Sequence, residues 1–260
     1  MLRPVPLVLL VSALCPAQDV NAILKRFLEA EGRNGEKAGR YTYVEHADYF
    51  NFDKNGRANK VLSETHEIVF VEGGPYRKLV ERNERPLGPR EQAREDKRLQ
   101  AFAALRRKNA HSGVFHRTFN LGSDDDLLTL FDNRLAGEEE VRGRKARVLE
   151  CTPKAGLKPA DTREKQATNF RRKLWIDEED YTLARSVYTV VGPDVGTTAG
   201  TTYSREFEKI GGDVWMQTSW VIDGHLQFAK LIKPKVRTEY TDSKFRKFDV
   251  QSTVTVDAGE

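Results

Sequence analysis

Five histidines are the residues best suited to bind a metal ion or to transfer a proton near neutral pH, but they are scattered along the chain. Only His111 and His116 lie near each other, and no carboxylate accompanies them at a spacing typical of metal ligands. We therefore expect no metal site. The five are His46, His66, His111, His116 and His225.

Other residues capable of catalysis also have structural explanations. The acidic runs 124–126 and 178–180 fall at an expected helix start and an expected hairpin turn, where negative charge is favourable or solvated. The glycine-rich run 192–198 lacks the Gly-Lys-Ser/Thr of a phosphate-binding loop, and the sequence contains no G-x-S-x-G nucleophile elbow. The sequence therefore predicts no catalytic residues and no cofactor.

The first residues have the three-part pattern of a secretory signal peptide. Arg3 precedes an apolar run at 5–14, and small residues lead to Ala17. We expect cleavage near Ala17, which leaves 18–260 as a single domain in the periplasm. The alternative is membrane anchoring through a lipidated Cys15, but Leu14 stands where a lipoprotein signal has Gly or Ala.

Removal of this leader leaves Cys151 as the only cysteine, so no disulfide can form within the mature chain. Cys151 lies in a strand-like segment, where a buried, unreactive thiol is the expected state. Burial of apolar side chains must therefore stabilise the fold.

The composition excludes two classes of function. Charged residues make up 32% of the 260 residues and the mean hydropathy is −0.62, so no segment beyond the leader could cross a membrane as a helix. The net charge is only +4, and no stretch combines Lys and Arg with aromatic residues as nucleic-acid-binding surfaces do. We expect no nucleic-acid partner.

The elements that would position any site are mainly strands. An amphipathic helix is predicted after Asp19, with Gly32 at its end, followed by three strands across 41–82 with a turn at 53–56. Helices are predicted at 89–108 and from Ser123 to Gly137, then about six strands from 138 to 250. Turns are expected at Gly211–Gly212 and Asp223–Gly224, and loops at 154–168 and 192–201.

The pattern predicts a mainly β (α+β) domain with a single antiparallel sheet. Its strands are rich in aromatic residues, which fit either an ordinary core or the lining of a cavity under a curved sheet. The helix at 89–108 is strongly charged but has one narrow apolar edge, so we expect it to lie over the mouth of such a cavity as a mobile lid.

Three segments resemble the periplasmic lipoprotein-carrier superfamily, the family of the outer-membrane lipoprotein-sorting chaperone. They are KLWIDEEDYTLARSVYTVV at 173–191, GDVWMQTSWVI at 212–222, and VEGGPYRKLV at 71–80. Gly74 stands where carriers of the family have an arginine before the proline. The order of elements between residues 19 and 250 is also similar to that of the family.

The resemblance implies a curved antiparallel sheet that forms an incomplete barrel, with helices covering its concave face. It also implies a non-enzymatic periplasmic carrier or chaperone that binds an acyl chain or a lipidated protein and acts in outer-membrane lipoprotein or lipid sorting. An envelope membrane protein would then be the donor or acceptor. The alternative is a non-catalytic interaction or sensor module of the cell envelope. The expected cavity residues are Leu79, Leu99, Phe102, Leu127, Phe131, Leu174, Ile176, Trp215 and Trp220.

The leader generates the first testable prediction. Expression in a Gram-negative host should yield envelope-localised protein that begins near Gln18, because the apolar run ends in the small residues that a signal peptidase accepts. Cell fractionation and intact-mass measurement would show this, and soluble cytosolic protein that retains Met1 would contradict it.

Overall fold

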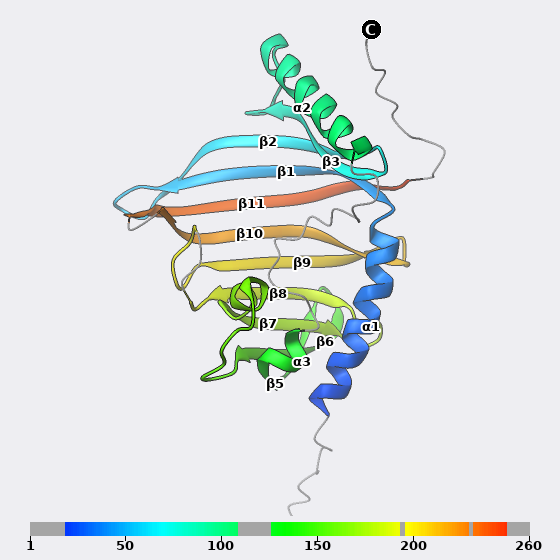
Figure 1. The fold of residues 1–260 in the computed structure, drawn as a ribbon, viewed down its shortest axis with the longest axis vertical. Helices are drawn as coiled ribbons and strands as arrows, with labels where there is room; N and C mark the ends of the chain where they lie inside the picture. The colour runs from blue at the N-terminus through cyan, green and yellow to red at the C-terminus, as the bar shows by residue number, and fades with distance from the viewer. Residues whose placement is uncertain (1–18, 109–125, 193–195, 229–230, 249–260) are drawn as a thin grey trace, which may run out of the picture.

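A computed structural model of the chain describes residues 19–108, 126–192, 196–228 and 231–248. Eleven antiparallel strands form one open sheet in the order β4-β3-β2-β1-β11-β10-β9-β8-β7-β6-β5 (Figure 1). The expected signal peptide lies outside the described residues. The strands are β1 Tyr41–Phe52, β2 Ala58–Val71, β3 Gly74–Arg82, β4 Arg85–Pro86, β5 Phe131–Val141, β6 Arg144–Pro153, β7 Phe170–Asp177, β8 Leu183–Val190, β9 Thr202–Ile210, β10 Val214–Phe228 and β11 Leu231–Lys247.

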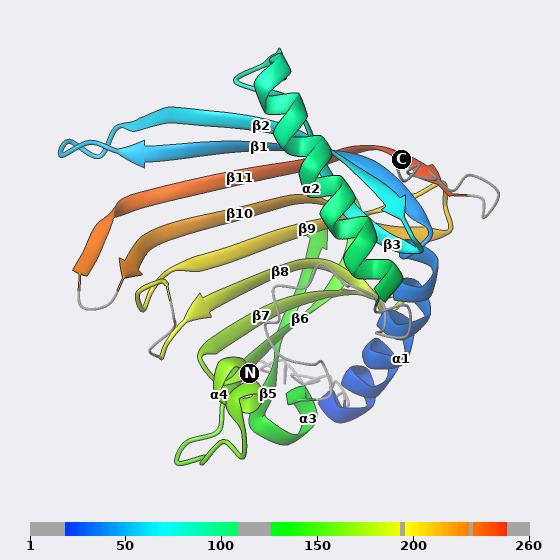
Figure 2. The same ribbon diagram turned by 45° about the horizontal axis from the view of Figure 1, so that its top comes forward.

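The sheet curves without closing into a barrel, and its helices lie on the concave side (Figure 2). The predicted fold class is therefore confirmed. The helices are α1 Val20–Ala38, α2 Pro89–Lys108, α3 Asp126–Leu130 and α4 Thr162–Ala167. Among the described residues, none of these helices combines the length and apolar character needed to cross a membrane.

The main core lies between α1 and the concave face of the strands from β5 to β10. Leu24 and Phe27 of α1 are almost fully buried there, together with Leu149 and Leu174 of the sheet. Because successive side chains of a strand point to opposite faces, the strand residues next to Leu149 and Leu174 face the other side of the sheet. On that side Trp175 contributes to a second, smaller cluster.

Two neighbouring strands separate at one end of the sheet, and we call this place the fork. β10 pairs with β11 from Ser219 onward, whereas its first residues pair only with β9. Beyond Thr241, β11 pairs only with β1. At the fork, Asn34 of α1 accepts from the backbone N–H of Trp215 at 2.8 Å and donates to its carbonyl at 2.9 Å. A side chain thus takes the place of the missing strand.

The outer edge of β3 is covered by α2. Glu95 of α2 is 2% exposed and accepts from the hydroxyl of Tyr76 at 2.7 Å and from the backbone N–H of Leu79 at 3.3 Å. Arg106 lies so close to Gly74 that a Cβ there would meet its guanidinium at 2.8 Å. The helix has the predicted bounds, and it packs along one edge strand through a buried carboxylate.

Two helices differ from the sequence expectation. α1 continues past Gly32 to Ala38 because tertiary contacts hold its last turns, including the Asn34 bonds and a 2.6 Å ion pair between Lys37 and Asp213. The expected helix from Ser123 to Gly137 is wrong at its end: α3 ends at Leu130 and β5 follows at once, while its expected start at 123–125 lies outside the described residues. Gly137 has φ +137° at a register shift in β5, so it marks a β-bulge.

The strand region contains further differences. The Asp223–Gly224 turn is wrong, because β10 runs through it: Asp223 pairs with Arg237 at 2.7 Å, and a Cβ on Gly224 would lie 2.2 Å from Thr201 Oγ1. This glycine allows a close approach instead of a turn. Seven strands follow α2, not about six, and the expected loop at 154–168 contains α4. The turns at 53–56 and 211–212 are confirmed.

Asn34 provides a direct test of the fork. Asn34→Ala would leave the partly buried N–H and C=O of Trp215 without these bonds, at a cost of about 1–3 kcal/mol in the free energy of unfolding. Urea denaturation measures this. Asn59→Ala is the matched control, because that amide is exposed and donates only to the nearby Arg57 carbonyl; we expect it to change stability by less than about 0.5 kcal/mol. Equal effects of the two variants would contradict the assignment.

Cys151 provides a second test of the fold. Burial of its side chain raises the pKa of the thiol to about 12, above the ordinary value of 9.0. The raised value favours the neutral thiol, so the folded protein holds roughly a thousandfold less thiolate than the unfolded chain near pH 8. Alkylation by iodoacetamide should therefore be at least about 100-fold slower in buffer than in urea. Comparable rates would show that the thiol is accessible.

Candidate functional site

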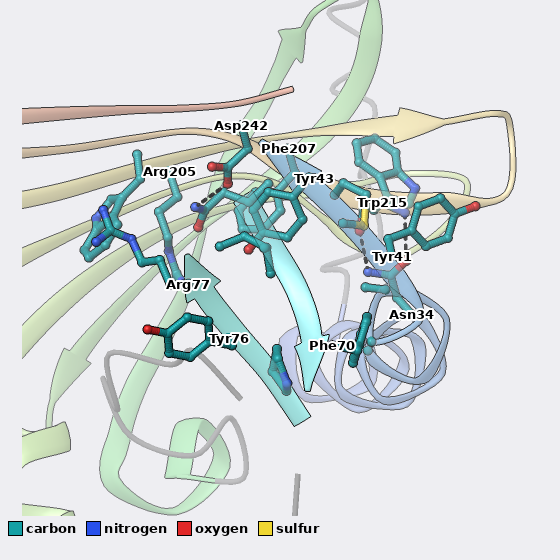
Figure 3. Close-up of a pocket in the computed structure, with 18 of the residues that line it drawn as sticks. Asn34, Tyr41, Tyr43, Phe70, Tyr76, Arg77, Arg205, Phe207, Trp215 and Asp242 are labelled. Carbon is teal, nitrogen blue, oxygen red and sulfur yellow. Dashed lines mark hydrogen bonds between the residues drawn. The ribbon is translucent and has the colours of Figure 1, made fainter. Parts of the chain in front are cut away.

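The candidate site is a cavity of about 660 Å³ at the fork of the sheet (Figure 3). The first residues of β10 and Asp242 of β11 bound it where these strands separate, the end of α1 forms one wall, and α2 contributes another. Its size falls within the range of about 300–1,000 Å³ typical of ligand pockets. Its lining includes Gly35, Tyr41, Tyr43, Ile68, Phe70, Tyr76, Arg77, Arg98, Phe102, Arg205, Phe207, Trp215, Gln217, Trp220 and Asp242.

Most of the wall is apolar, and the strand pattern explains why. Tyr41 and Tyr43 are two positions apart on β1 and so share one face of the sheet, and Ile68 of β2, which pairs with Tyr43, lies on the same face. Phe102 of α2 packs against Tyr76 with their ring centroids 5.0 Å apart and extends this aromatic wall. A large apolar chain could replace water along this surface with a favourable change in free energy.

One part of the cavity is polar. Arg77 of β3 donates to Glu45 at 2.5 Å, and Glu45 is fully buried on β1. Asp242 is the neighbour of Glu45 on β11 and is 5% exposed; Gln217 donates to it at 3.3 Å across the fork. Burying charges is costly without compensation, so ion pairs and hydrogen bonds hold these groups.

Arg205 of β9 is the other arginine at this polar part (Figure 3). Its Nε donates to Ser186 Oγ at 3.2 Å, and its guanidinium carbon lies 4.9 Å from the ring centroid of Tyr188 and 5.8 Å from that of Phe207. These contacts fix the position of the guanidinium by stacking and by one neutral hydrogen bond.

This arrangement is suited to binding. No group of three His, Cys, Asp or Glu side chains among them is arranged to hold a metal ion. Burial and the bond to Glu95 raise the pKa of Tyr76, so its hydroxyl stays protonated as a donor. Cys151 does not line the cavity.

The structure distributes the expected cavity residues over three places. Phe102, Trp215 and Trp220 line the cavity, although the indole of Trp215 also packs in the cluster on the opposite face. Leu79 and Leu99 lie where α2 packs on β3. The remaining four are in the filled core beneath α1: Leu127, Phe131, Leu174 and Ile176. Their role in ligand binding stays a prediction.

The polar residues of the cavity were not identified from the sequence. A signal was present in part: Arg205 lies between Tyr203 and Phe207 at alternating positions of one strand, so a charged residue occupies the face of its aromatic neighbours. The fork itself has no local signal, because it depends on which strands pair across the whole chain.

The comparisons with known proteins give the following findings. No family model matches the sequence, and no curated protein matches it. Solved structures that are similar include a domain described as an outer membrane lipoprotein-sorting protein from Vibrio parahaemolyticus, with 13% identity, a TM-score of 0.40, and coverage of 86% of this chain and 92% of that chain. A LolA superfamily protein from Nitrosomonas europaea has 12% identity, a TM-score of 0.36, and coverage of 88% and 94%.

A DUF1329 family protein from Desulfovibrio piger has 15% identity, a TM-score of 0.36, and coverage of 90% of this chain and 95% of that chain. With such low identities and TM-scores, these likenesses carry no part of the functional proposal. The first two are described in the terms of the superfamily that three segments of this sequence resemble.

Proposed function

We propose that this protein is a periplasmic carrier or chaperone that binds an acyl chain, free or attached to a lipidated protein, in the cavity at the fork. The observation that supports this most is a cavity of about 660 Å³ whose wall is largely aromatic and aliphatic. Apolar surface in water is unfavourable by about 25 cal/mol per Å², so an acyl chain in transit across an aqueous compartment needs such a cover.

The cavity stays open because its two sides are held separately. On one side, Asn34 ties α1 to β10 at Trp215. On the other side, Glu95 ties α2 to β3. These hydrogen bonds hold each wall to its own strand, and at Trp215 and Leu79 they satisfy backbone groups.

The wider role follows from the same proposal. The mature domain of residues 18–260 would work in the periplasm, exchange its cargo with an envelope membrane protein, and take part in outer-membrane lipoprotein or lipid sorting. α2 would act as the mobile wall, because it packs on the edge of the sheet, mainly on β3, and its outer face is charged.

Gly35 offers a way to block the cavity without damaging the core. It lies in α1, lines the cavity, and a Cβ built on it meets no atom within 4 Å. Gly35→Phe should fill space that an acyl chain needs and lower the affinity for a fluorescent fatty acid by at least about tenfold, the effect of about 1.4 kcal/mol. The melting temperature should not fall, because glycine is the weaker residue in a helix interior.

Gly32→Phe is the matched control. Gly32 lies one turn earlier in the same helix, also has open space around a built Cβ, and does not line the cavity. Its binding should match that of the unchanged protein. If the fluorescent fatty acid shows no saturable binding to the unchanged protein, the carrier proposal fails, and a stable protein partner recovered in native mass spectrometry would then favour the interaction module.

A further inference from the structure

Three arginines line the cavity, and they differ in how their charge is compensated. Arg77 pairs with Glu45 at 2.5 Å, and Arg98 lies 3.4 Å from Glu95 with 71% of its side chain exposed to solvent. Among the residues that the structure describes, no carboxylate lies within ion-pair distance of Arg205; its contacts are the Ser186 hydroxyl and the rings of Tyr188 and Phe207.

Arg205 is nevertheless held in a partly buried position. A guanidinium is always charged, and removing it from water without an anion is unfavourable. The two rings and the hydroxyl orient the planar group but leave most of its five donors for another acceptor. An anion that enters the cavity would therefore find a donor that is already positioned.

The apolar wall lies beside this cation. Figure 3 shows Arg77 and Arg205 on one side of the cavity, and Phe70 and Tyr41 on the other. A ligand that satisfies both parts must have an apolar chain and an anionic group at one end. Carboxylate and phosphate share this chemistry, and both accept two parallel hydrogen bonds from a guanidinium.

We propose that Arg205 binds the anionic headgroup of an acyl amphiphile, with the chain of that ligand lying against the aromatic wall. This rests on the proposed function, since it assigns the ligand class of the same cavity. The protein would thus distinguish an acyl anion from an uncharged chain of the same length.

The test compares matched ligands in competition against an uncharged, environment-sensitive fluorescent probe. Palmitate and hexadecanol have the same chain and differ in headgroup charge, and palmitoyl lysophosphatidate carries a phosphate. The unchanged protein should bind one or both anions at least about tenfold more tightly than hexadecanol. Arg205→Gln should lower the affinity for the preferred anion by about 10- to 100-fold and leave the affinity for hexadecanol unchanged. The tighter of the two anions identifies the headgroup.

Two further variants complete the design. Arg185→Gln removes the same charge from β8. Ser186 pairs with Arg205, and Arg185 is the residue before Ser186, so Arg185 lies on the opposite face of the sheet, where it donates to Glu206 at 2.8 Å. It should leave the preference unchanged. Arg205→Lys keeps the charge and should keep part of the preference, so it provides the test if Arg205→Gln fails to fold.

Each outcome is distinct. The role of Arg205 would be overturned if all three ligands bound with equal affinity, or if Arg205→Gln lowered the affinities for palmitate and hexadecanol equally. Either result would leave the carrier function in place. Failure of every ligand to displace the probe would overturn the carrier function itself. A preference for anions that survives Arg205→Gln would assign the headgroup to another residue.

Discussion

The separation of β10 from β11 is the feature on which the candidate site depends. A continuous ladder between these strands would bring their inner side chains together and leave no room for a ligand. Separated strands expose backbone donors and acceptors, and such groups are costly when buried without partners. Asn34 resolves this conflict at Trp215, because one amide group provides both an acceptor and a donor.

The position of the charges follows from the same geometry. A filled β core would not tolerate Glu45, Asp242 and Arg205 on one face unless each were matched. Here the charged groups gather where the strands part, and the main apolar core lies further along the sheet beneath α1. The main core and the cavity therefore occupy largely different parts of one surface.

Local patterns in the sequence were sufficient for most elements and insufficient for their arrangement. Alternation of side chains predicted the first three strands, and the bounds of α2 followed from its helix-forming residues. The expectation failed where a contact distant in sequence decided the outcome. Gly32 does not end α1 because Asn34 and Lys37 are bound to β10 and its turn, and Asp223–Gly224 is not a turn because Arg237 and Thr201 pack there.

The candidate site shows the same division. The aromatic content of the strands was visible in the sequence, and three of the expected residues, Phe102, Trp215 and Trp220, are among those that line the cavity. The partition between cavity and core could not be predicted, because Leu174 and Trp220 both belong to the main core and only Trp220 also lines the cavity. Coverage by a helix depends on its full length, which the sequence pattern underestimated.

The central place of β11 in the sheet has a consequence for how the chain folds. Of the strands that the structure describes, β11 is synthesised last, yet it joins β1 to β10, and its pairing of Tyr41 with Lys247 spans most of the described chain. Without β11, β1–β3 and β5–β10 have no strand between them, and each part of the sheet has an open edge there. Contacts so distant in sequence slow folding and open edges favour aggregation, so we expect the insertion of β11 to be the late step that joins the two parts of the sheet.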